Sequence, residues 1–227
     1  EICRKPVNRV NDILYTKILP VLCDKYIDRY TCVGNVLRDA VIEDVGQKVD
    51  VIGNPINGIY TDDSRPSKTQ GSILNFVTCS LISRRKKLEL ALEFVFHVKQ
   101  KTKVVFNIIG PIRDDVYYQE LQVLIEELGL NHEVNFHGSL NSLKILDVYK
   151  KSDIGIFFSQ EETFGLAPLE MLASGLPLIT TNVGVLAEHR EKYEALGVEF
   201  LDTDRECADM VKRAITNSDA KSTQEFI

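Results

Sequence analysis

The stretch "DIGIFFSQEETFGLAPLEMLASGLPLITT", residues 153–181, decides the fold of this chain. It opens with an apolar run, passes through a polar cluster into a segment with helical character, and closes with a second apolar run, "PLITT". Pro168 falls in the first turn of that helix, where a missing N–H costs little. The order strand, helix, strand predicts a βαβ unit with parallel strands.

The same alternation continues on both sides of this stretch. Apolar runs typical of strands and amphipathic segments typical of helices follow one another, with Gly129 expected at one helix end and Asn141 or Ser142 as a helix cap. The further expected strands are 73–81, 103–110, 133–138 and 197–201, and the further expected helices are 86–101, 114–130, 140–152, 185–196 and 204–218. Near-continuous apolar strands are buried on both faces, so the sequence predicts a doubly wound, Rossmann-like α/β domain with a parallel sheet.

Residues 1–56 have a different pattern. A helical segment with a break near Pro20 is followed by a short strand, a helix and a strand ending in Asn-Pro. We interpret 1–56 as the last elements of an N-terminal domain, the polar, turn-rich 57–71 as a linker, and 72–227 as a second domain. Because the chain starts at Glu1 rather than Met, we expect a fragment of a longer protein.

Composition narrows the class of protein. The 227 residues are 44% hydrophobic and 26% charged with a net charge of −6, which favours a soluble globular protein and argues against nucleic-acid binding. No apolar run approaches the roughly 20 residues of a membrane span, and no signal peptide is recognisable. Five cysteines without CxxC spacing predict reduced thiols in a cytoplasmic protein, and four histidines without ligand spacing predict no metal site.

The polar cluster between the two apolar runs of 153–181 has the chemistry of a ligand site. A helix that begins near 164–167 points its free N–H groups at the carboxyl edge of the sheet, and Gly165 leaves space for a ligand beside the backbone. Such a helix start binds phosphate. Glu162 and Glu170 add carboxylates that accept hydrogen bonds from a diol. A nucleotide-sugar, with phosphates, a ribose diol and a hexose, fits all three features.

These residues also carry a family resemblance. "ETFGLAPLE" followed by "MLASGLPLITTNVG" resembles the E-x7-E element of retaining glycosyltransferases of family 4, which have the GT-B fold. The run from "VVFNIIGP" to "DIGIFFS" and the hinge-like "VIGNPIN" (51–57) are similar to the same family, so the likeness covers roughly 30–215. The resemblance implies the nucleotide-sugar-binding C-terminal domain of such an enzyme.

The resemblance also implies roles for the two acids and their neighbours. Glu162 matches the glutamate that contacts the donor sugar near the reacting carbon, and Glu170 matches the one that holds the ribose. Phe164, Gly165 and Leu166 match the turn whose N–H groups meet the distal phosphate and the sugar, and the preceding Thr163 is expected at the substrate.

Lys86 matches the lysine of the family's diphosphate clamp, and with Glu162 it forms the expected catalytic pair. His137 and Gly138, next to Ser139, match the loop beside the base, and Gly110 matches the glycine after an earlier strand. Two positions depart from the pattern. Leu81 stands where the clamp has an arginine, so Arg84 or Arg85 could reach the phosphates instead, or Lys86 could act alone; Val185 replaces the second glycine of a "GG-x-x-E" turn that keeps Gly184 and Glu188.

The implied function is transfer of a hexose from a nucleoside diphosphate sugar to an acceptor hydroxyl with retention, in glycan or polysaccharide biosynthesis, without a metal or other cofactor. The expected partners are the donor, a glycan or lipid-linked acceptor and the missing N-terminal domain, with possible contact at the cytosolic membrane face. Two alternatives stay open. One is another GT-B enzyme such as a nucleotide-sugar epimerase, and the other is a non-catalytic nucleotide-sugar-binding partner subunit, which Leu81 favours.

Overall fold

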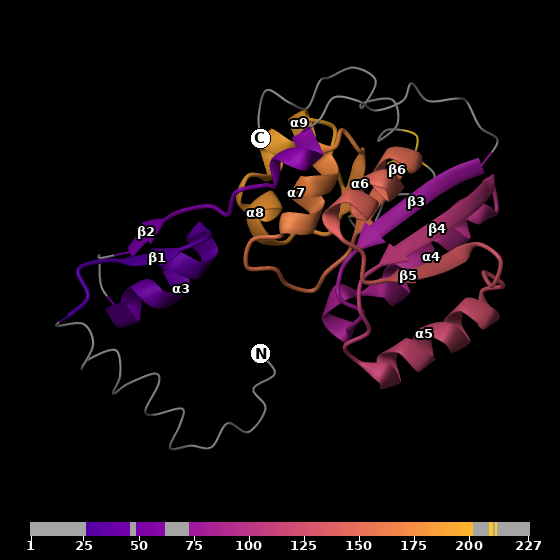
Figure 1. Cartoon of the computed structure of the whole chain (residues 1–227), viewed down its shortest axis with the longest axis horizontal. Coiled ribbons are helices and arrows are strands. Elements are labelled where there is room, and N and C mark those ends of the chain that lie inside the picture. The colour runs from indigo at the N-terminus through magenta and orange to yellow at the C-terminus, as the bar shows by residue number, and fades with distance from the viewer. Residues whose placement is uncertain (1–25, 46–48, 62–72, 202–208, 211, 213–227) are drawn as a thin grey trace. The chain divides into compact units, whose positions relative to one another are not determined.

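The computed structural model describes residues 26–45, 49–61, 73–201, 209, 210 and 212 (Figure 1). The chain forms two compact units, residues 1–54 and 55–227. In the first unit, strand β1 (Tyr30–Cys32), helix α3 (Asn35–Val45) and strand β2 (Val49–Val51) make a βαβ element with parallel strands. The strand, helix and strand predicted after residue 30 are therefore confirmed, whereas the helix predicted around Pro20 lies outside the described residues.

The second unit begins earlier than the sequence predicts. Residues Gly58–Thr61 form a 3-10 helix, η2, and Tyr60 is only 1% exposed. The turn is closed by Asn57, whose carbonyl accepts from the Tyr60 N–H at 3.0 Å. Residues 57–61 of the predicted linker therefore include a short helix and one buried aromatic residue, in spite of their polar composition. Residues 62–72 lie outside the described part of the chain.

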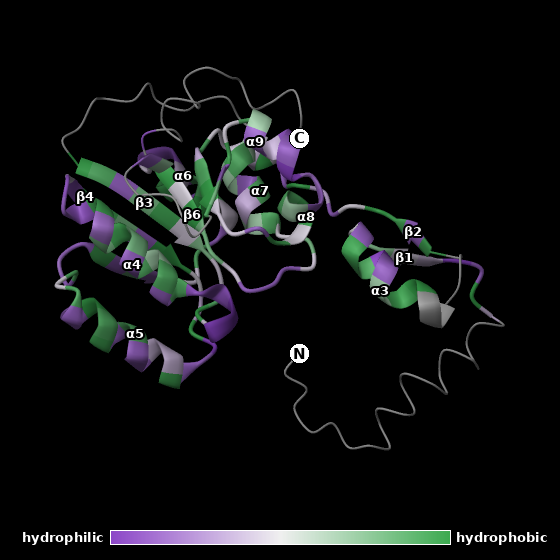
Figure 2. Cartoon of the chain, turned by 180° about the vertical axis from the view of Figure 1, so that it is seen from behind, coloured by the Kyte–Doolittle hydropathy of each residue, from purple (hydrophilic) through white to green (hydrophobic). Residues whose placement is uncertain are grey.

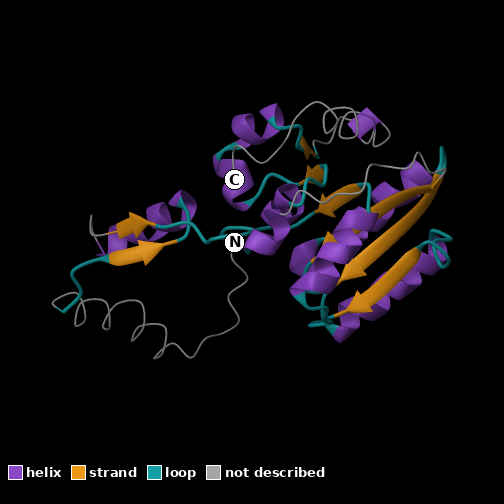
Figure 3. Cartoon of the chain, turned by 45° about the horizontal axis from the view of Figure 1, so that its top comes forward, coloured by secondary structure: helices purple, strands orange, loops and turns teal. Residues whose placement is uncertain are grey.

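The second unit is built on a six-stranded sheet in the order β5-β4-β3-β6-β7-β8, with every pairing parallel. Figure 3 shows the long strand arrows pointing the same way. The strands are β3 (Ile73–Cys79), β4 (Lys103–Ile109), β5 (Val134–Gly138), β6 (Ile154–Phe157), β7 (Leu178–Thr180) and β8 (Glu199–Phe200). The chain runs outward from β3 to β5 and then crosses back to β6, which is the doubly wound order. The predicted fold class is confirmed.

Both faces of this sheet are buried. Neighbouring residues along a strand face opposite sides, so Phe76 packs in one apolar core and Val77 in the other. The first core contains side chains of α4 and α5, and the second contains side chains of α6, α7, α8 and α9. Figure 2 shows the apolar colour concentrated on the strands and on alternating turns of α4 and α5. The helices are α4 (Leu88–Lys99), α5 (Asp115–Glu127), α6 (Ser142–Lys151), α7 (Leu166–Ala173), α8 (Gly184–Glu188) and α9 (Arg190–Ala195).

Local sequence signals explain where several helices begin and end. Asp114 caps α5 by accepting from the Tyr117 N–H at 2.9 Å, and Asn141 caps α6 by accepting from the Lys144 N–H at 3.0 Å. Of the two caps that the sequence allowed for α6, the structure uses Asn141. Gly129, just past α5, has the positive φ of 62° expected at a helix end. Most of the predicted helix 204–218 lies outside the described residues.

Candidate active site

The chain crosses from β5 back to β6, which lies beside β3, and this reversal of strand order creates the switch point of the sheet, where ligands bind in doubly wound folds. A short 3-10 helix, η3 (Arg84–Lys86), follows β3, and the polar loop 158–165 follows β6. Since β3 and β6 are adjacent parallel strands, both segments emerge at the same carboxyl edge. This topology brings together Lys86 and Glu162, which are 76 residues apart in the sequence.

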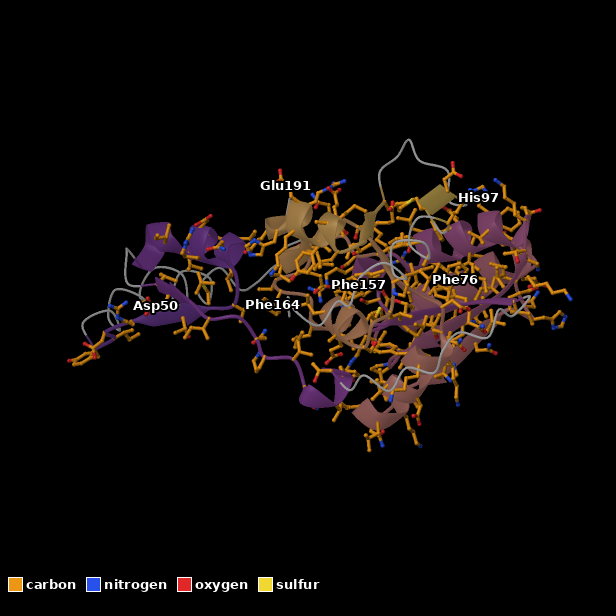
Figure 4. All side chains as sticks on the ribbon, turned by 90° about the horizontal axis from the view of Figure 1, so that it is seen from above. Asp50, Phe76, His97, Phe157, Phe164 and Glu191 are labelled. Atoms are coloured by element: carbon orange, nitrogen blue, oxygen red, sulfur yellow. The ribbon has the colours of Figure 1, made fainter. Side chains whose placement is uncertain are left out.

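Lys86 and Glu162 form the central ion pair of the site. The Lys86 ammonium donates to Glu162 Oε1, and their side chains are only 9% and 12% exposed. The ammonium also lies 5.4 Å from the ring centroid of Phe157, on β6. Figure 4 labels Phe157 among the packed side chains of the second unit. The carboxylate of Glu162 balances the charge of the buried Lys86 ammonium, so an anionic ligand must compete with Glu162 for Lys86.

Ser159 and Thr181 hold the loop that carries Glu162, and the sequence prediction missed both. The Ser159 N–H donates to Thr181 Oγ1 at 2.9 Å, and the Thr181 hydroxyl donates to the Ser159 carbonyl at 2.8 Å. Ser159 Oγ lies within reach of Glu162 Oε1 at 3.2 Å and of the Glu161 carbonyl at 2.9 Å. The signal that could have found them is position, because each lies one or two residues after a buried strand, at the carboxyl edge.

The start of α7 faces this loop. Gly165 caps the helix with φ at 92°, a left-handed conformation that favours glycine, and Pro168 lies in the first turn as predicted. The Phe164 carbonyl accepts from the Val185 N–H at 2.9 Å. A Cβ on Gly184 would lie 2.4 Å from that carbonyl oxygen, so this glycine permits the close approach of α8. The valine that replaces the second glycine of the motif is accommodated and contributes a backbone hydrogen bond.

Arg84 and Arg85 have different environments. The Arg84 guanidinium donates to Glu120 at 2.6 Å and lies 5.4 Å from the Tyr117 ring centroid, so it is held against α5. Arg85 is exposed, and its carbonyl accepts from the Gln160 N–H at 2.8 Å, which ties η3 to the loop after β6. Leu81, at the expected arginine position, is 39% exposed. Of the two arginines, Arg84 is thus paired with α5, whereas the Arg85 side chain is exposed.

Glu170 lies on α7, one to two turns from its start. Its side chain is partly buried, and burial raises the pKa of its carboxyl group. The same carboxylate contributes to raising the pKa of Tyr60, Cys79 and Tyr149. These three groups come from η2, β3 and α6, and burial is the largest cause of the raised pKa of each.

Gly110 follows β4, and His137 and Gly138, which are predicted to lie beside a base, form the end of β5. The Gly110 N–H donates to the Gly138 carbonyl at 2.8 Å, which joins these strand ends. His137 is exposed and its Nε2 lies 2.8 Å from Asn107 Oδ1 on β4. Among the described residues, no hydrogen bond or ion pair joins these three residues to Lys86 or Glu162. The structure thus places the three residues at the predicted edge, on strands further along the sheet.

Thr163 is exposed and Leu166 is 39% exposed at the start of α7, so both are accessible to a ligand. A separate cavity of about 590 Å³ lies at the opposite, amino edge of the sheet and contains none of the predicted site residues. Its lining comes from the starts of β3 and β4, the end of α4 and the turn before β5. The site at the carboxyl edge is therefore defined by its residues and not by this cavity.

Other predictions concern thiols, metals and membranes. Cys32 and Cys79 are free thiols, and the other three cysteines lie outside the described residues. In the described part of the chain, no group of three or more His, Cys, Asp or Glu side chains is arranged to hold a metal. Among the helices that the structure describes, none combines the length and apolar character needed to span a bilayer.

The family model for glycosyl transferases group 1 matches residues 61–226, well over half of the chain. The chain belongs to this family. It is 25% identical to the phosphatidylinositol N-acetylglucosaminyltransferase GPI3 subunit of Saccharomyces cerevisiae, covering 80% of this chain and 41% of that protein. It is 23% identical to an uncharacterized glycosyltransferase of Methanocaldococcus jannaschii, covering 58% of this chain and 49% of that protein. The chain spans about half the length of these relatives, or less.

Solved structures show the same fold. HepE from Anabaena, in complex with UDP and glucose, superposes with a TM-score of 0.75 at 17% identity, covering 96% of this chain and 62% of that one. A glycosyltransferase from Rickettsia africae superposes with a TM-score of 0.72 at 18% identity, covering 98% and 62%. These neighbours support the expectation of a GT-B C-terminal domain with a remnant of the N-terminal domain.

Proposed function

We propose that this chain is the donor-binding part of a retaining glycosyltransferase that transfers a hexose from a nucleoside diphosphate sugar to an acceptor hydroxyl. The observation that carries the proposal is the buried Lys86–Glu162 pair at the switch point, next to the start of α7. HepE, solved with UDP and with UDP-glucose, supports a nucleotide-sugar as the ligand.

In this proposal, donor binding exchanges partners at the ion pair. The diphosphate takes Lys86, Arg85 and the N–H groups at the start of α7, while Glu162 turns to the hydroxyls of the hexose. Positive charge fixed beside the leaving diphosphate stabilises the charge that develops as the glycosidic bond breaks. The chemistry then needs no metal, and the leaving phosphate accepts the proton of the attacking hydroxyl on the same face of the sugar.

The remaining predicted contacts complete the donor site. Glu170 accepts hydrogen bonds from the ribose, the loop around His137 and Gly138 flanks the base, and Gly110 lets the strand ends approach the nucleotide. The acceptor is a glycan or a lipid-linked glycan, bound together with an N-terminal domain on the cytosolic side of a membrane. The name of the yeast relative, which acts on phosphatidylinositol, supports a lipid-linked acceptor.

Calorimetric titration of the chain with UDP, GDP, ADP and their sugars tests the donor site. One nucleotide should bind selectively, and Lys86→Ala and Glu170→Ala should each weaken binding. Lys87→Ala is the matched control, because the Lys87 side chain is 41% exposed and pairs with Glu89. A folded chain that binds none of these nucleotides would contradict the proposal. For the full-length enzyme, free nucleoside diphosphate plus a glycoside indicates transfer, and an isomerised donor indicates an epimerase.

A further inference from the structure

Lys87 has an unusual backbone conformation directly after the lysine of the proposed donor site. Of the residues that the structure describes, it is the only one other than glycine with a positive φ, at 44° with ψ at 43°. This left-handed conformation brings the Cβ of an L-residue close to the following carbonyl oxygen, so it is disfavoured for lysine. A residue keeps such a conformation only where its surroundings fix it, and these places cluster at functional sites. The contacts on both sides of Lys87 must therefore fix this turn.

Tyr117 on α5 holds the chain directly after this turn. Lys87 caps α4, and the first N–H groups of a helix have no partner within the helix. The Tyr117 hydroxyl oxygen accepts a hydrogen bond from the Leu88 N–H at 2.8 Å, and the Glu89 N–H is directed at the same oxygen at 3.4 Å. The hydroxyl donates in turn to the Glu89 carboxylate. Since Tyr117 is only 3% exposed, the partner that it offers to α4 is itself fixed by packing.

The ring of Tyr117 also holds the chain before the turn. The Arg84 guanidinium lies over this ring, 5.4 Å from its centroid. The Arg84 carbonyl accepts from the Lys87 N–H at 3.2 Å, which closes the turn around Lys86. One side chain of α5 therefore contacts both ends of the segment 84–88.

The opposite side of the turn is tied to the loop that carries Glu162. The Arg85 carbonyl accepts from the Gln160 N–H at 2.8 Å, and the Lys86 ammonium donates to Glu162 itself. In the proposed function, donor binding separates Lys86 from Glu162, so the side-chain part of this tie is lost in the bound state. The contacts with Tyr117 do not involve Glu162, so they continue to hold the turn when the diphosphate is bound.

We propose that Tyr117 is a positioning residue for Lys86, because its hydroxyl and its ring hold this turn in the conformation that presents the lysine to the diphosphate of the donor. The inference rests on the proposed role of Lys86 in the donor site. It gives a task in donor binding to α5, a helix that contributes no predicted contact with the donor. Without the hydroxyl, Lys87 relaxes toward negative φ and the backbone of Lys86 turns with it.

The test is a double-mutant cycle, measured by calorimetric titration with whichever of UDP, GDP or ADP binds best. Tyr117→Phe removes the hydroxyl and keeps the ring, so the packing of α5 is retained. In the wild-type background we expect it to weaken binding about fivefold, which corresponds to one lost hydrogen bond. In the Lys86→Ala background the same change should weaken binding less than about twofold, because the lysine that Tyr117 positions is absent.

Tyr118→Phe is the matched control. Tyr118 is the next residue of the same helix, and its ring packs on Phe136 of β5, with the ring centroids 5.2 Å apart. Its substitution should leave binding within about twofold of the wild-type value. Lys87→Gly, introduced into the Tyr117→Phe chain, should restore most of the lost affinity, because glycine adopts a positive φ without the steric penalty.

A folded Tyr117→Phe chain that binds as tightly as the wild type, or that is weakened equally in both backgrounds, would overturn the inference. A glycine variant that restores no affinity would overturn it as well. If instead no nucleotide binds, or Lys86→Ala binds as tightly as the wild type, the proposed role of Lys86 is refuted and the inference falls with it.

A second measurement needs no variant of Tyr117. The Leu88 N–H has no partner within α4, so its protection from hydrogen exchange depends on the Tyr117 hydroxyl. Exchange followed by NMR should show this N–H protected in the free chain. Nucleotide at about ten times its Kd should slow the exchange about tenfold, because a ligand that binds only the capped turn stabilises it by that factor. Rapid exchange in the free chain, or protection that a saturating nucleotide does not change, would refute the positioning role.

Discussion

Replacing Lys86 by methionine should destabilise the second unit more than any exposed lysine would. The Lys86 and Glu162 side chains are 9% and 12% exposed, so deleting the cation leaves a nearly buried carboxylate with Ser159 as its remaining side-chain partner. Breaking a buried pair by removing one partner costs about 3–5 kcal/mol. Because the site lies at the sheet edge, where water can enter, we expect the lower end, about 3 kcal/mol.

The double variant Lys86→Met/Glu162→Gln distinguishes the stability effect of the unpaired charge from that of altered side-chain packing. With both charges removed, no unpaired charge remains, and stability should return to within about 1 kcal/mol of the wild-type chain. Lys87→Met is the matched control. Its ammonium is 3.6 Å from Glu89 on the surface, and an exposed pair of this kind contributes at most about 1 kcal/mol.

Thermal unfolding followed by circular dichroism measures these differences. For a unit of this size, about 3 kcal/mol corresponds to a lowering of Tm by roughly 6–12 °C. The reasoning is refuted if Lys86→Met lowers Tm no more than Lys87→Met does, or if the double variant is as unstable as the single one. Either result would mean that Glu162 is well hydrated without its lysine.

Three further outcomes follow from the site. Glu162→Gln should abolish transfer in the full-length enzyme yet strengthen binding of the free nucleoside diphosphate, measured by calorimetry, by about tenfold. The reason is that the Glu162 carboxylate and a phosphate, as two unit charges about 6 Å apart, repel by up to about 3 kcal/mol. Unchanged or weaker binding would show that Glu162 does not compete for Lys86. Gly184→Ala should unfold at a lower denaturant concentration than Gly129→Ala. Both glycines have positive φ, but only at Gly184 would the new Cβ lie 2.4 Å from the Phe164 carbonyl oxygen. Equal denaturant midpoints for the two variants would mean that the α8 turn shifts freely. Glu170→Gln should raise stability at pH 7 and lose this advantage in acid, because burial raises the pKa of Glu170 and so makes its charged form unfavourable in the folded chain. The denaturant midpoints of wild-type and variant chains should be measured from pH 7 to below the ordinary glutamate pKa of about 4.3. A difference between the two midpoints that does not shrink in acid would contradict this prediction.

Local patterns in the sequence were sufficient for most of the described elements and their order, although the predicted helix 185–196 forms two helices, α8 and α9. The apolar runs and the helical spacing predicted the strands and helices of the second unit, because a strand or helix buried on one or two faces must repeat its apolar residues with its own period. The start of α7 was also predictable. Gly165 and Pro168 mark it chemically, so Glu162 and Glu170 could be assigned to opposite sides of a helix start before any contact was known.

The contacts of the site were decided by the tertiary structure. Lys86 meets Glu162 only because β3 and β6 are neighbours, and strand order is a property of the whole sheet that no local period encodes. The different environments of Arg84 and Arg85 depend on Glu120, a residue of α5 that binds Arg84. Tyr60 lies in a polar segment that predicts a linker, and it is buried because η2 packs against α6 and α7. Periodicity records which side of an element is buried, whereas the partner that buries it is set by packing between distant segments.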